Sequence, residues 1–146
     1  MTAPSRPIYV AEPPAQYLVH PPLVVDCSIL AGVLFQEDWQ KEALLSMQGR
    51  SLKAPQLLAV EIASVALKKH RHGGIDIARD GLSLFAEMDI ALFTVPTTEV
   101  FALALRYQLS TYDAAYLWLA TELKAPLATF DEKLATAAQA HLSALP

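Results

Sequence analysis

The segment that decides the fold of this chain is Leu23-Val24-Val25-Asp26-Cys27-Ser28-Ile29-Leu30, where a short apolar run ends in an acid. Residues 23–25 are aliphatic and mostly β-branched, which predicts a buried strand. After Asp26 the apolar residues recur at helical spacing, with Ser28 as the candidate cap; they are Ile29, Leu30, Val33 and Leu34. A strand that passes directly into a helix is typical of a parallel sheet covered by helices.

The rest of the chain repeats this alternation of short apolar runs and longer amphipathic ones. Further strands are predicted at residues 52–54, 90–95 and 126–129, with a short edge strand at 142–145. Helices are predicted near residues 39–47, 57–69, 75–88, 100–105, 113–123 and 131–140. We therefore expect an α/β fold: a three-layer α/β/α sandwich around a parallel sheet of four or five strands. Counted from residues 23–25, the strands would take the order 3-2-1-4-5.

Residues 1–22 differ from the rest of the chain. They hold six of the ten prolines and show neither helical nor alternating apolar spacing. We expect a proline-rich N-terminal arm here, followed by one domain over residues 23–146. Apolar residues at 8–10 and 17–19 favour an arm that docks on the domain over a free tail.

Composition limits the class of protein. A chain of 146 residues, 53% of them hydrophobic, can form one packed domain. No apolar run reaches the roughly 18 residues of a membrane span, and the N-terminus lacks a secretory pattern, so we expect a cytoplasmic protein with no membrane partner. Cys27 is the only cysteine, which excludes an internal disulfide and favours a buried structural role. The net charge of -4 argues against nucleic-acid binding by bulk electrostatics but leaves a metal-dependent nuclease open.

Four acidic residues occupy the ends of predicted strands or lie within the first turns of predicted helices: Asp26, Glu61, Asp113 and Asp131. The expected strand order would place them in one crevice at the carboxyl edge of the sheet. Clustered carboxylates suit Mg²⁺ or Mn²⁺, and a bound cation can turn water into a nucleophile. Each acid also has a structural explanation, because carboxylates near a helix N-terminus bond free backbone N–H groups or stabilise the helix dipole.

Short motifs around these acids carry a resemblance to a known family. Asp26 is followed two residues later by Ser28, and Glu61 follows the strand end Ala54-Pro55. The most specific segments are Tyr112-Asp113-Ala114-Ala115-Tyr116, with Leu119-Ala120 after it, and Thr129-Phe130-Asp131. From residue 23 to about 141 the chain resembles PIN-domain proteins, and most of all the VapC toxins of bacterial toxin-antitoxin pairs.

The resemblance implies a Mg²⁺- or Mn²⁺-dependent endoribonuclease that cuts tRNA or another structured or translated RNA. Its metal-binding and catalytic residues would be Asp26, Glu61, Asp113 and Asp131. The hydroxyl groups of Ser28 and Thr129 would orient these carboxylates or their waters. The resemblance also implies a cognate antitoxin protein that silences the enzyme, and a homodimer.

Two further features have more than one interpretation. The only dense basic run contains Lys68, Lys69 and Arg71, which can contact RNA or can be a solvated helix end favoured by the helix dipole. Tyr112 and Tyr116 lie four residues apart on one helical face, a spacing that favours packing or a subunit contact over base stacking.

Two other functions remain open from the sequence. A catalytically silent PIN scaffold that binds RNA or protein would keep the fold without cutting. A receiver-like or phosphohydrolase domain also gathers aspartates at strand ends, but it needs a lysine after the last strands, and Lys133 falls within a predicted helix instead.

Overall fold

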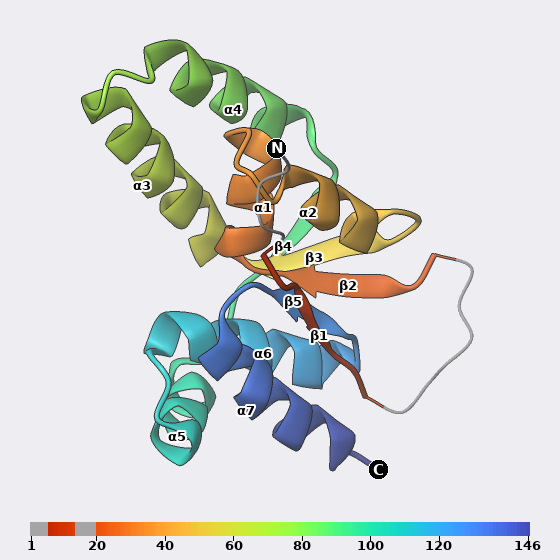
Figure 1. Ribbon diagram of the computed structural model, residues 1–146. Helices are drawn as coiled ribbons and strands as arrows, with labels where there is room; N and C mark the ends of the chain where they lie inside the picture. The colour runs from red at the N-terminus through yellow and green to blue at the C-terminus, as the bar shows by residue number, and fades with distance from the viewer. Residues whose placement is uncertain (1–5, 14–19) are drawn as a thin grey trace.

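The computed structural model describes residues 6–13 and 20–146, in which strands and helices alternate (Figure 1). The strands are β1 (Tyr9–Ala11), β2 (Pro22–Val25), β3 (Ser51–Pro55), β4 (Ile90–Phe93) and β5 (Leu127–Thr129). The helices are α1 (Cys27–Leu34), α2 (Gln40–Met47), α3 (Leu57–Arg71), α4 (Ile75–Glu87), α5 (Thr97–Tyr107), α6 (Thr111–Leu123) and α7 (Glu132–Ser143). The predicted α/β class is confirmed.

The five strands form one sheet in the order β1-β5-β2-β3-β4. β2 pairs in parallel with both β3 and β5, and β4 pairs in parallel with β3. The four strands predicted from residue 23 onward therefore lie in the predicted order. β2 is central and covered on both faces, because Val24 and Val25 are both 0% exposed.

The predicted edge strand at residues 142–145 is wrong. α7 continues to Ser143, and Leu142 is fully buried on the helix face that also carries Leu134 and Ala138 at intervals of four residues. A four-residue apolar segment is too short to separate the period of a strand from that of a helix. The fifth strand is β1, which comes from the N-terminal arm and pairs with β5 in the antiparallel direction.

Helices cover both faces of the sheet, which confirms the three-layer sandwich. α1, α2, α3 and α4 lie on one face, and α5, α6 and α7 lie on the other (Figure 1). α3 and α4 form an antiparallel pair that projects from the sheet, and the chain reverses between them at Gly73, whose φ of 89° favours glycine. Among the helices of the described residues, none is long and apolar enough to cross a membrane.

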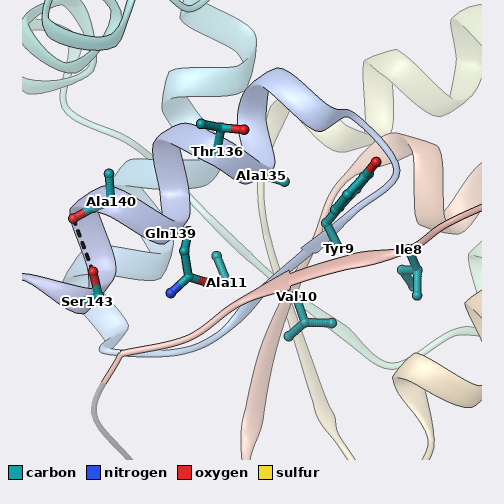
Figure 2. Close-up of a pocket in the computed structure, with 9 residues that line it drawn as sticks. All are labelled: Ile8, Tyr9, Val10, Ala11, Ala135, Thr136, Gln139, Ala140 and Ser143. Carbon is teal, nitrogen blue, oxygen red and sulfur yellow. Dashed lines mark hydrogen bonds between the residues drawn. The ribbon is translucent and has the colours of Figure 1, made fainter.

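The arm docks between the outer edge of β5 and α7. Tyr9 lies opposite Thr129 in the sheet, and alternate residues of β1 point to opposite sides. Tyr9 and Ala11 point to the side of α7, whereas Val10 points away from it (Figure 2). A pocket of about 600 Å³ remains between the strand and α7, and no acid is among its described lining residues. Residues 17–19, which were expected to help the docking, lie outside the described part of the chain.

Candidate active site

Asp26 lies at the junction of β2 and α1 and is held by three hydrogen bonds. One carboxylate oxygen, Oδ1, accepts from the backbone N–H of Ile29 at 3.2 Å and from the Ser28 hydroxyl at 2.6 Å. The other oxygen accepts from the Thr129 hydroxyl. Asp26, rather than the predicted Ser28, is therefore the N-cap of α1. The side chain is only 6% exposed, so its orientation is set by these partners.

Ser28 and Thr129 also tie Asp26 to the end of β5. The Ser28 hydroxyl oxygen accepts from the Phe130 N–H at 3.0 Å, and the Thr129 hydroxyl oxygen accepts from the Asp131 N–H at 2.9 Å. Each hydroxyl donates to Asp26 and accepts from the β5 end, so the two strands close around the carboxylate. The structure thus places both hydroxyls where the sequence predicted carboxylate-orienting groups.

Asp131 lies directly after β5 and caps α7. Its Oδ1 accepts from the backbone N–H of Leu134 at 2.9 Å, which satisfies one of the free donors at the helix start. Its side chain is exposed. Asp131 therefore has the structural role of a helix cap, which the sequence analysis left open for each of the four acids. One oxygen engaged in capping leaves the other oxygen available to a ligand.

Asp113 occupies the first turn of α6, which Ser110 caps by accepting the Asp113 N–H at 3.1 Å. Burial raises the pKa of the Asp113 carboxyl, and the negative charge of Asp131 raises it further. A hydrogen bond with Ser110 and the charge of Lys133 act in the opposite direction. Lys133 is thus near the cluster although it lies in α7.

Glu61 reaches the cluster from the second turn of α3. Its Oε1 accepts a hydrogen bond from the Tyr116 hydroxyl at 2.7 Å. Burial raises the pKa of Glu61, the Tyr116 bond lowers it, and the charge of Asp113 raises it. Tyr116 is 1% exposed, so the predicted packing is correct, whereas its hydrogen bond to Glu61 was not predicted. The available signal was its spacing of three residues from Asp113, which places both on one helix face.

The four carboxylates form one electrostatic unit centred on Asp113. The charge of Asp113 raises the pKa of both Asp26 and Glu61. The charge of Asp131 in turn raises the pKa of Asp113. Burial is the largest cause for Asp26, whose pKa is raised from 3.8 to about 6. These carboxylates disfavour one another's ionisation, and a divalent cation bound among them would stabilise their ionised form.

The arrangement fits a hydrated cation better than a fully dehydrated one. Among the residues that the structure describes, no three acidic, histidine or cysteine side chains stand close enough to bind one ion directly together. Mg²⁺ does not need such a set, because it keeps several waters and takes one or two carboxylates directly. The acids can therefore hold a cation partly through its waters, with buried Asp26 held rigidly beneath the more accessible Asp113 and Asp131.

Cys27 adjoins the acids but is not equipped as a nucleophile. The half-buried thiol has a pKa raised to about 12 by burial and by the charges of Glu61 and Asp26. A thiol that stays protonated at neutral pH is a poor nucleophile. Water is therefore the better candidate nucleophile in this site.

The basic run is not part of the acidic cluster. Lys68, Lys69 and Arg71 occupy the last turn of α3, at the outer end of the projecting helix pair (Figure 1). Eight residues of helix separate Glu61 from Lys69, a rise of about 12 Å. Lys69 forms an ion pair with Glu37. The position of the basic run agrees with a solvated helix end. Contact of these residues with RNA stays a prediction.

The acids gather where the chain changes direction across the sheet. From β2 the chain continues to β3 on one side, and it later returns to β5 on the other side. Ligands of open α/β sheets bind at such a point, outside the carboxyl ends of the strands. Fold and site together define an α/β domain with a cluster of acidic residues at its topological switch point.

Comparisons with known proteins agree with this class. The model of the PIN domain family matches residues 23–140. Ribonuclease VapC3 of Pyrobaculum aerophilum is 32% identical over 120 residues, which cover 77% of this chain and 92% of that protein. The crystal structure of PAE2754 from Pyrobaculum aerophilum shares the fold, with a TM-score of 0.63 and 22% identity over 80% of this chain and 79% of that chain. The chain belongs to the PIN-domain family and is VapC-like, which confirms the resemblance seen in its motifs.

Proposed function

We propose that this protein is a Mg²⁺- or Mn²⁺-dependent endoribonuclease that hydrolyses phosphodiester bonds of RNA. The observation that carries the proposal is the coupling of Asp113 with Asp26, Glu61 and Asp131 at the carboxyl edge of the sheet. The 32% identity to a protein named as a ribonuclease supports RNA as the substrate class. A transfer RNA, or another structured or translated RNA, is the proposed target.

The residues of the chain have separate roles in this reaction. A cation bound at the cluster would polarise the phosphodiester and lower the pKa of the attacking water. Ser28 and Thr129 fix Asp26, and Tyr116 fixes Glu61, so that both carboxylates offer oxygens in set positions.

Asp113 is the proposed proton acceptor. Its half-buried carboxylate lies in the first turn of α6, beside the place of the cation, and can take the proton that the attacking water loses. The water oxygen bonds to phosphorus as the bond from phosphorus to the leaving ribose oxygen breaks. That oxygen takes up a proton from solvent.

We further propose that the enzyme acts in the cytoplasm as the toxin of a pair and is silenced by a cognate antitoxin. An apolar groove between α3 and α4 supports the proposal that a protein partner binds to this helix pair. Its volume is about 530 Å³, and its apolar lining includes Ala63, Ala66, Leu67, Ile75, Ala78 and Leu82. Apolar segments of partner proteins bind in such grooves as amphipathic helices.

A homodimer is the proposed assembly of the toxin. Phe101 and Leu105 of α5 are 55% and 66% exposed, and Tyr112 at the start of α6 is 61% exposed. Phe101 and Tyr112 also line an apolar pocket between α5 and α6. An exposed apolar surface of this kind is typical of a subunit contact, as the sequence analysis suggested for Tyr112.

The test is cleavage of RNA by the purified protein after removal of any partner. Total RNA and individual tRNAs, including the initiator tRNA, are incubated with Mg²⁺, Mn²⁺ or EDTA. Asp26→Asn and Asp113→Asn remove proposed ligands, and Glu122→Gln removes an exposed acid elsewhere on α6 as the matched control. We expect discrete metal-dependent fragments from the native protein and from Glu122→Gln alone. A folded protein that binds RNA or protein but leaves all RNA intact would instead be the silent scaffold.

A further inference from the structure

The arm carries one arginine to the carboxyl edge of the sheet. β1 runs antiparallel to β5 with Tyr9 opposite Thr129, the last residue of β5. Residues that precede Tyr9 therefore extend past the end of β5, toward the edge where the acids gather. Arg6 lies in this extension and is exposed. The match to the PIN domain family begins only at residue 23, so Arg6 belongs to a part of the chain outside that match.

Two aromatic rings hold the Arg6 guanidinium in place. Its Cζ lies 4.4 Å from the ring centroid of Trp39 and 5.5 Å from that of Phe130. The two rings pack edge to face, with centroids 6.0 Å apart. A guanidinium over an aromatic face is attracted by the ring quadrupole, most strongly over tryptophan. We call Trp39 and Phe130 the aromatic shelf.

The aromatic shelf is bonded to the residues that orient Asp26. The Trp39 indole N–H donates to the Ser28 carbonyl at 3.3 Å, and the Phe130 backbone N–H donates to the Ser28 hydroxyl at 3.0 Å. Ser28 in turn donates to Asp26. Arg6 thus lies on two residues that are hydrogen-bonded to Ser28, the serine that orients Asp26 at the rim of the acidic cluster.

The charge of Arg6 is not neutralised within the described residues. None of the three ion pairs found there includes Arg6. Among the side-chain hydrogen bonds found in the described residues, none comes from Arg6, so its N–H groups are available to bind an anion. Arginine presents those donors as a fork that matches two oxygens of a phosphate.

We propose that Arg6 is a positioning residue that binds a phosphate of the RNA backbone next to the phosphate being cut. This inference rests on the proposed ribonuclease function. An acidic cluster repels a polyanion, so the RNA strand needs a cation beside the cluster to lie across it. Lys133 lies near Asp113. Arg6 supplies a second cation on the side of Phe130. Lys69, in contrast, is paired with Glu37 and lies at the outer end of α3.

The test compares three substitutions of Arg6 in the full-length protein. Arg6→Gln removes the charge, Arg6→Met removes it while keeping an apolar stem on the aromatic shelf, and Arg6→Lys keeps the charge without the fork. Arg50→Gln is the matched control, because Arg50 lies directly before β3, at the opposite edge of the sheet. The probe is a fluorescent oligoribonucleotide that spans a cleavage site mapped with the native protein.

Two measurements separate a phosphate contact from a structural role. Loss of one charged contact should raise KM roughly tenfold for Arg6→Gln and Arg6→Met and leave kcat within about twofold. Binding to the same probe, measured on the Asp113→Asn background, should show a salt slope that is smaller by about 0.7 for both variants. Arg6→Lys should keep the salt slope, and Arg50→Gln should resemble the native protein. Circular dichroism spectra and melting temperatures check that each variant is folded.

Different results overturn the inference and the proposed function. If the native protein cuts RNA while Arg6→Gln and Arg6→Met keep its KM and salt slope, Arg6 makes no phosphate contact. A lower kcat with an unchanged salt slope would show instead that Arg6 acts only by holding the arm. A loss of slope in Arg6→Lys equal to that in Arg6→Gln would also contradict a charge contact. If the native protein cuts no RNA, the proposed function fails, and the inference fails with it.

Discussion

Replacing Asp26 with asparagine should stabilise the metal-free protein at neutral pH. Burial raises the pKa of this carboxyl from 3.8 to about 6, so the folded protein binds the proton more tightly than the unfolded chain does. The contribution of the protonated Asp26 carboxyl to the free energy of unfolding is complete below the unfolded pKa of 3.8, and it is lost as the pH rises through about 6. At pH 8 the ionised native side chain therefore costs about 3 kcal/mol of stability, which a neutral amide avoids.

Part of this gain is offset by hydrogen bonding. Asparagine still caps α1 and still offers an oxygen to Ser28 and Ile29. Its amide nitrogen would face the Thr129 hydroxyl, which now donates to Asp26 and already accepts from Asp131. One compromised bond of this kind costs about 1 kcal/mol. The net expectation is a gain of about 2 kcal/mol at pH 8 and a loss of at most about 1 kcal/mol at pH 4, where the native carboxyl is protonated and mainly the compromised bond counts.

Urea denaturation followed by circular dichroism, in EDTA at pH 4, 6 and 8, measures this difference. The native protein is compared with Asp26→Asn and with Glu122→Gln, whose acid is exposed and whose replacement should change the free energy of unfolding little at any pH. The reasoning is refuted if Asp26→Asn lowers stability at pH 8, or if its effect is the same at pH 4 and pH 8.

Three further substitutions test individual contacts. Tyr116→Phe removes the bond to Glu61 and should cost about 1 kcal/mol by urea denaturation and slow RNA cleavage; an unchanged rate would exclude a role in the site. Gly32→Ala would place Cβ 2.5 Å from the Trp39 ring, so it should destabilise by about 1–3 kcal/mol and change tryptophan fluorescence, against the usual gain for this exchange in a helix. Asp131→Ala should cost about 1 kcal/mol as a lost cap, whereas Asp131→Asn should keep stability; if Asp131→Asn also keeps full metal-dependent cleavage, Asp131 is only a cap.

The central part of the fold could be predicted because burial on both faces leaves a clear pattern. Residues 23–25 and 127–129 are fully or almost fully buried, and their apolar runs were recognised as strands. The edge strand β1 left no such signal, although the opposite edge strand, β4, was predicted. Tyr9–Ala11 is a three-residue strand with one side exposed, so its sequence does not differ from that of an extended arm.

The charged centre of the site was also more predictable than its supporting contacts. Asp26, Asp113 and Asp131 lie next to strand ends or helix starts, positions that local patterns locate, and the parallel topology brings them together. The Tyr116 bond to Glu61 and the contact of Arg6 with Trp39 join residues that are far apart in the chain. Such contacts depend on how elements pack: the spacing of Tyr116 from Asp113 indicates a shared helix face, but it does not identify Glu61 as the partner.

Cleavage of RNA in water enriched in ¹⁸O tests the central claim most directly. Mass spectrometry of the fragments determines which oxygen attacked the phosphorus. The account predicts linear terminal phosphates that carry ¹⁸O from the earliest time points, with no 2′,3′-cyclic phosphate preceding them, formed with Mg²⁺ and absent with EDTA or with Asp113→Asn, because water activated at the acidic cluster is the nucleophile. Fragments that end in 2′,3′-cyclic phosphates, or cleavage that persists in EDTA, would show that the ribose hydroxyl attacks instead and would contradict the account.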